Sequence, residues 1–173
     1  MANSRKQVRW LENGWPSPSG APNYRLDPDL GFDKPLLRAV LDYWNGIRGE
    51  RRMPSRRDLN PADLPRDAVS SVAMTDILRE PHLRFRWRLL GTEITRRAER
   101  DSTGKYWDEV YDPETLEWFS TATRWLVENR RPVRFVCTFP IEGKSFITME
   151  TVELPFSDDG EQVNMTMAVV IMD

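Results

Sequence analysis

The sequence predicts an α+β domain in which one antiparallel sheet packs against short helices. The prediction rests on a C-terminal hairpin, on apolar helical stripes, and on the order of strands and helices along the chain. Every second residue from Val163 to Ile171 is apolar, as expected for a strand with one buried face. A strand over 146–156 precedes it, and the connecting segment 157–160 ends in Asp-Gly, which favours a tight turn.

The other face of the last strand changes character along its length. It begins polar, with Asn164 and Thr166, and ends apolar, with Ala168, Val170 and Met172. A sheet face that is partly apolar must be partly covered. We therefore expect a second layer on this side of the sheet.

Composition limits the classes of function. The chain has 173 residues, 39% of them hydrophobic, which is enough for one domain with a core. Its 25 basic and 27 acidic residues give a net charge of -2, which predicts no general attraction to nucleic acid or to an anionic membrane. One cysteine and one histidine exclude an internal disulfide and a thiolate- or histidine-rich metal site. Without an apolar run of about 18 residues or a signal-peptide core, we expect a cytoplasmic protein.

Residues 1–32 read as an irregular N-terminal arm, followed by a domain over 33–173. The arm is rich in proline and glycine and has neither helical nor strand periodicity. Trp10, Trp15 and Tyr24 either dock on the domain itself or serve as anchors for a partner.

The first helix is predicted over 33–46. Asp33 and Pro35 suit its start, and Leu37, Val40, Leu41 and Trp44 fall on one apolar stripe. The stripe fits two interpretations, a cover for the second face of the sheet or the face of a homodimer. An arginine-rich run over 48–57 follows, read either as a solvated loop or as an anion or phosphate site.

The remaining elements follow in order. A helical turn over 61–64 leads to strands over 69–77 and 84–90, the second with strict alternation, and to a short helix through Ile94 and Ala98. The segment 103–105, Thr-Gly-Lys, lacks the preceding glycines of a phosphate loop. Asp112 and Pro113 begin a longer helix that runs to Val127, and a strand over 133–139 precedes the hairpin.

This order, with its local motifs, resembles the PAS domain, and more narrowly the PAS-like group of short stand-alone bacterial proteins. The resemblance covers about residues 34–172. It rests on these segments: Tyr43-Trp44, Met53-Pro54-Ser55-Arg56, Asp58-Leu59-Asn60-Pro61, Leu64-Pro65, Phe85-Arg86-Trp87-Arg88-Leu89-Leu90-Gly91-Thr92, Asp101-Ser102-Thr103-Gly104-Lys105, Arg131-Pro132-Val133 and Glu153-Leu154-Pro155-Phe156-Ser157.

The resemblance implies a five-stranded antiparallel sheet with helices on one face, a pocket between the two layers, and a role in sensing or protein interaction. It also implies frequent dimerisation through the N-terminal helix. We expect ligand-binding residues on the inner sheet face and the neighbouring helices: Trp87, Arg88, Leu89, Ile94, Tyr106, Phe119, Cys137, Met149 and Met165. For Arg88, strand alternation favours an outer-face charge over a pocket anchor.

Two cofactors that some PAS domains carry are not supported. A flavin photosensor needs a cysteine in the helix after the second strand, where this chain has Ile94 to Ala98 without one. A haem sensor needs an axial histidine on the long helix, whereas His82 lies in a turn. We therefore expect neither group and leave any cofactor unknown.

Three functions remain, and the first is preferred. It is a stand-alone sensory PAS module that binds a small molecule or a signalling protein and has no output domain of its own. The second is a structural interaction adaptor with a filled core. The third, an enzyme, is disfavoured because no nucleophile–base motif is present, and Glu150 and Glu153 face opposite sides of their strand. We therefore expect no catalytic residues.

Overall fold

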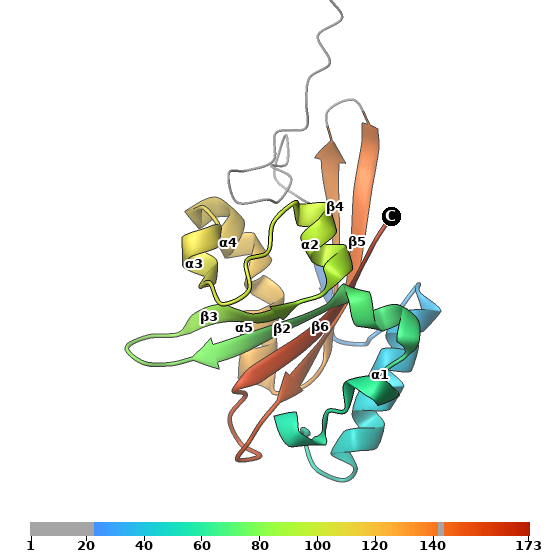
Figure 1. Cartoon of the computed structure of the whole chain (residues 1–173), viewed down its shortest axis with the longest axis vertical. Coiled ribbons are helices and arrows are strands. Elements are labelled where there is room, and N and C mark those ends of the chain that lie inside the picture. Colours follow the sequence, from blue (N-terminus) through green and yellow to red (C-terminus); the bar gives the residue numbers. More distant parts are fainter. Residues whose placement is uncertain (1–22, 142–143) are drawn as a thin grey trace, which may run out of the picture.

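A six-stranded antiparallel sheet runs through the middle of the molecule (Figure 1). The computed structural model describes residues 23–141 and 144–173. Across these residues the strand order is β1-β4-β5-β6-β2-β3, and each neighbouring pair is antiparallel. The strands are β1 (Asn23–Asp27), β2 (Val72–Leu78), β3 (Arg84–Leu90), β4 (Val133–Ile141), β5 (Lys144–Phe156) and β6 (Met165–Met172).

Helices cover both faces of this sheet (Figure 1). Trp44 of α1 and Thr123 of α5 both hydrogen-bond to β5, and Thr123 reaches Glu153 on the face opposite to Glu150. The predicted α+β class is therefore confirmed, with helices on two faces and not on one. The helical elements are α1 (Pro35–Arg48), η1 (Arg56–Asp58), η2 (Pro61–Asp63), η3 (Arg66–Ser71), α2 (Thr92–Ala98), α3 (Trp107–Val110), α4 (Pro113–Phe119) and α5 (Thr121–Asn129).

The sheet has six strands, whereas five were predicted, because part of the expected arm joins it. Residues 23–27 form β1, which pairs with β4 so that Tyr24 lies opposite Cys137. The ring of Tyr24 also packs on Phe135, with 5.8 Å between ring centroids. Tyr24 therefore docks on the domain itself, while Trp10 and Trp15 lie outside the described residues.

Helix α1 covers the second face of the sheet. Its four stripe residues, Leu37, Val40, Leu41 and Trp44, are at most 4% exposed. The indole Nε1 of Trp44 donates to the carbonyl of Pro155 at 2.9 Å, which fixes the helix on β5. The stripe that fitted either a sheet cover or a dimer face is thus used within the chain.

The C-terminal strands form the predicted open sheet. β4, β5 and β6 are consecutive neighbours, and β1 and β3 are its two edges. The β5–β6 connection is longer than the predicted turn over 157–160, since β5 ends at Phe156 and β6 begins only at Met165. Within it, Gly160 adopts a φ of 81°, and the carboxylate of Asp159 accepts from the N–H groups of Glu161 and Gln162, each at 2.8 Å. The turn therefore uses glycine for its positive φ and an aspartate to satisfy the freed N–H groups.

The long helix predicted from Pro113 to Val127 is divided into two. Its start is as expected, because the carboxylate of Asp112 accepts from the N–H of Thr115 at 2.9 Å. Ser120, with φ -81° and ψ -4°, separates α4 from α5. The break lets α5 turn to place Thr123 against β5.

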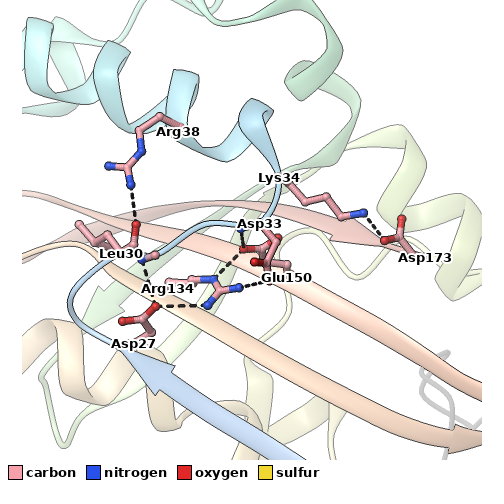
Figure 2. A network of polar contacts seen from close by, with 9 residues as sticks. Asp27, Leu30, Asp33, Lys34, Arg38, Arg134, Glu150 and Asp173 are labelled. Carbon is pink, nitrogen blue, oxygen red and sulfur yellow. Dashed lines mark hydrogen bonds and ion pairs between the residues drawn. The ribbon is translucent and has the colours of Figure 1, made fainter.

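A buried arginine links the N-terminal segment to the sheet on the α1 side (Figure 2). Arg134 is 2% exposed and donates to three carboxylates: to Glu150 at 2.6 Å, to Asp27 at 3.2 Å and to Asp33 at 2.5 Å. The N–H of Asp33 donates to the same Glu150 oxygen at 2.9 Å. The cluster therefore joins β4 and β5 to the segment between β1 and α1.

The cluster also shifts the pKa values of Asp27 and Arg134 toward their charged forms. Burial alone would raise the pKa of Asp27, but hydrogen bonds from the N–H of Gly31 and from Arg134 lower that pKa below its usual value. Burial likewise opposes the charge of Arg134, whereas Glu150 raises the pKa of its guanidinium. Removing the arginine would leave the Glu150 carboxylate buried without its cation.

Replacing Arg134 with Met should destabilise the protein by about 3–5 kcal/mol, the usual cost of breaking a buried ion pair from one side. Urea unfolding at neutral pH measures this loss. Arg25→Met is the matched control, because it removes the same charge from an exposed position on β1. Equal losses of stability in the two variants would contradict the role of the cluster.

Candidate functional site

A cavity lies between the inner face of the sheet and helices α2 to α5. Its volume is ≈ 50 Å³, room for roughly three or four water molecules. Its walls come from β2 to β6 and from α2, α3, α4 and α5. The lining residues are Ala73, Thr75, Trp87, Ile94, Trp107, Phe119, Ala122, Thr123, Phe135, Met149, Thr151, Glu153, Ala168 and Val170.

One wall of the cavity is aromatic. Ring centroids of Trp87 and Trp107 are 4.7 Å apart, and Phe119 lies 5.0 Å from Trp107 and 6.0 Å from Trp87. Backbone hydrogen bonds from Trp87 N–H to Lys105 and from Gly104 N–H to Trp87 hold the preceding loop against β3. Gly104 has a φ of 87°, so the Thr-Gly-Lys segment is a turn that carries Trp107 to the cavity.

Glu153 is the acidic residue of this cavity, and it is 5% exposed. Its carboxylate accepts from the hydroxyl of Thr123 on α5 at 2.5 Å and from that of Thr166 on β6 at 3.4 Å. Burial raises the pKa of Glu153 to about 7, and these two hydroxyls offset only part of that effect. The carboxyl group therefore titrates near neutral pH. Its protonated form can donate a hydrogen bond, whereas its ionised form only accepts hydrogen bonds.

Three other polar atoms of lining residues have no hydrogen-bond partner within residues 23–141 and 144–173. They are the indole Nε1 atoms of Trp87 and Trp107 and the hydroxyl of Thr151. Trp87, Trp107 and Thr151 are 4%, 3% and 7% exposed, so bulk water does not hydrogen-bond to these three atoms. Most buried polar groups in proteins are paired, so donors left over beside a cavity suit a guest that accepts hydrogen bonds.

Of the nine predicted ligand-binding residues, Trp87, Ile94, Phe119 and Met149 line the cavity. Tyr106 does not, because its ring lies under Arg84, with the guanidinium 3.7 Å from the ring centroid. Its neighbour Trp107 occupies the expected place instead.

Leu89 lies outside the cavity because β3 contains a bulge, whereas Arg88 lies outside it as strand alternation predicts. Trp87 pairs with Thr75, but Leu89 pairs with the adjacent Met74, so one residue of β3 is skipped. Leu89 consequently leaves the inner face and is 43% exposed. Arg88 donates to Asp76 at 2.9 Å on the outer face, the position that alternation favoured.

Met165 and Cys137 are buried but do not line the cavity. Met165 pairs with Phe156, on the sheet face that α1 covers, so the expectation confused the two faces of β6. Cys137 shares the inner face with Met149, and burial raises the pKa of its thiol to about 12. The thiol is therefore protonated at neutral pH, which suits a packing role.

Sequence reasoning missed Trp107, Thr123, Thr151 and Glu153. Glu153 carried the one usable signal, since a carboxylate on the inner face of a strand must be either paired or protonated. The expectation that Glu150 and Glu153 face opposite sides is confirmed, because Glu150 binds Arg134 and Glu153 lines the cavity. Within residues 23–141 and 144–173, no three His, Cys, Asp or Glu side chains gather as a metal would require.

A match to a protein family agrees with this architecture. A sequence model of the PAS domain matches residues 32–170. Among solved structures the chain is similar to one described as "Structure of an RNA-binding Light-Oxygen-Voltage Receptor", with 17% identity and a TM-score of 0.45. That alignment covers 91% of this chain and 40% of the receptor chain, so this chain spans less than half of the receptor's length. No curated protein matches the chain.

Glu153→Gln should remove a pH dependence of stability. The folded pKa, about 7, lies above the ordinary 4.5. Stability from the neutral carboxyl is therefore full below pH 4.5 and is lost as pH rises to 7, by about 3 kcal/mol. Urea unfolding from pH 4.5 to 8 should show wild type falling relative to Glu153→Gln.

The control for this comparison is Glu161→Gln, which removes the same charge from a side chain that is 79% exposed. It should follow the wild-type curve throughout. If Glu153→Gln also runs parallel to wild type, Glu153 does not change its protonation between the unfolded and folded states.

Proposed function

Because the chain belongs to the PAS domain family, whose members are generally sensory rather than catalytic, we propose that it is a sensory module that binds a small molecule between its sheet and helices. The observation that carries this proposal is the cavity with its unpartnered donors. A core that served packing alone would gain nothing from leaving two indole N–H groups and a hydroxyl unsatisfied. A ligand that accepts hydrogen bonds from these groups would offset the free-energy cost of removing them from water.

The walls describe the guest. Three aromatic rings favour a flat, unsaturated molecule, and the volume of ≈ 50 Å³ favours one of few atoms. The indole N–H groups call for an acceptor on the ligand, and Glu153 calls for a donor or a cation. A small nitrogen heterocycle, with both kinds of group in one ring, meets these requirements.

The same cavity connects ligand binding to the helices. Thr123 and Ala122 of α5 and Ile94 of α2 line it, so a guest touches helices as well as the sheet. The proposal includes a signalling protein that reads the position of these helices and on which the module acts. A homodimer through α1 would have to use its polar outer side, because the apolar stripe is buried.

No helix in the described part of the chain is long and apolar enough to cross a membrane. The proposed setting is the cytoplasm, where a small metabolite reaches the cavity directly. The competing function is an adaptor that uses its surfaces alone and keeps the cavity without a ligand. The two functions differ in whether the cavity accepts a guest.

Filling the cavity should abolish ligand binding. Ala168 lines the cavity from β6, so Ala168→Leu should occupy its volume at a stability cost of about 1–3 kcal/mol from overpacking. Imidazole serves as the probe, and its binding is measured by the change in intrinsic tryptophan fluorescence, to which Trp87 and Trp107 contribute; native mass spectrometry of freshly purified protein detects a retained ligand. Wild type should respond to imidazole or retain extra mass, and the variant should do neither.

Ala39→Leu is the matched control, because it adds the same atoms on the exposed side of α1. It should bind as wild type does. An absence of both imidazole binding and retained mass in all three proteins would favour the adaptor, provided that the proteins melt cooperatively.

A further inference from the structure

A second hollow, separate from the cavity, lies where the end of α1 meets the turn between α5 and β4. Its volume is ≈ 490 Å³. Its walls bring together two parts of the chain that are far apart in sequence. The lining residues are Leu30, Leu41, Trp44, Asn45, Arg48, Glu50, Arg51, Arg52, Asn129, Arg130, Arg131 and Pro132.

The hollow is strongly basic in a chain whose net charge is -2. Five of its lining residues are arginines and one, Glu50, is an acid. Such a local excess of positive charge attracts anions and raises their concentration near the surface.

Part of this charge is explained by the fold. Arg48 donates to the carbonyls of Gly49 and Arg51 at the end of α1, where a cation stabilises the helix terminus. Arg51 pairs with Asp58 at 2.9 Å, and Arg130 reaches Glu161 at 3.6 Å. These three arginines have structural partners.

Arg52 and Arg131 are not explained in this way. Both are exposed, and neither forms an ion pair with a residue in the described part of the chain. The guanidinium of Arg131 lies 5.4 Å from the ring centroid of Trp125, an arrangement that leaves its N–H edges open. Among the residues that the structure describes, two guanidinium groups thus present donors without a carboxylate partner at one hollow.

We propose that this hollow binds a phosphate-bearing small molecule of about nucleotide size. Guanidinium groups match phosphate oxygens with two parallel hydrogen bonds. A hollow of ≈ 490 Å³ lies within the range of small-molecule sites, about 300–1,000 Å³. Its apolar residues, among them Leu41 and Pro132, offer a wall for a ring.

The site uses only part of the arginine run that the sequence shows. Arg56 donates to the carbonyl of Leu59 at 3.2 Å, and neither Arg56 nor Arg57 lines the hollow. Instead, Arg130 and Arg131, which follow the end of α5, line the hollow together with Arg48, Arg51 and Arg52. A long polyanion is less suited, because the charge is confined to one hollow and the chain as a whole is acidic.

Calorimetric titration of the full chain at physiological ionic strength tests the proposal. The probes are sodium triphosphate, ATP without metal, and adenosine. We expect triphosphate and ATP to bind and adenosine not to bind, and Arg52→Gln/Arg131→Gln to weaken both by about tenfold or more. The control Arg25→Gln/Arg66→Gln removes the same charge from exposed sites outside the hollow and should change affinity less than about twofold.

Three outcomes would overturn the proposal. One is a lack of triphosphate and ATP binding to wild type, and another is equal weakening in both double variants, which would indicate unspecific charge attraction. The third is tighter binding of a hepta-glutamate peptide than of triphosphate, which would make the hollow a docking site for an acidic protein segment. The Ala168→Leu variant should bind ATP as wild type does, so this site and the cavity are tested separately.

Discussion

The ion cluster around Arg134 constrains the whole arrangement. A guanidinium buried in a sheet needs carboxylates, and this one takes them from β5, from the end of β1 and from the residues before α1 (Figure 2). Satisfying it brings the N-terminal segment across the sheet, which places β1 on β4 and lays α1 over β5. The ion pair of Lys34 with Asp173 fastens the start of α1 at a second point. With one face closed by α1, the opposite face is left to α2–α5 and the cavity.

Two glutamates of β5 show that the two faces of the sheet have different roles. Glu150 faces α1 and is paired with a cation, so its charge stabilises the fold. Glu153, three residues later, faces the cavity and has only hydroxyl partners, so burial moves its pKa to about 7. The pleat of one strand thus places a structural ion pair and a titrating group on opposite sides of the sheet. The cavity therefore contains a carboxyl group, that of Glu153, which can donate or accept a hydrogen bond according to what a bound ligand offers.

Periodicity predicted most of the fold, because buried faces impose it. The hairpin, the stripe of α1 and the cap at Asp112 follow from local rules and were found in place. Strand β1 was missed although Tyr24 and Leu26 alternate with polar neighbours, because five residues at the end of a proline-rich segment are too short a run to identify a strand, and its pairing with β4 is a long-range contact. The candidate site was only partly predictable: a bulge moved Leu89 off the inner face, and Glu153 reaches Thr123 only because α5 turns at Ser120.

Helix α5 belongs to both proposed sites. Thr123 holds Glu153 in the cavity, and Asn129, the last residue of α5, lines the arginine hollow. Six residues of helix separate them, about 9 Å along the axis. The two proposed sites thus share one continuous helix but no lining residue, so a substitution in one site removes no side chain of the other.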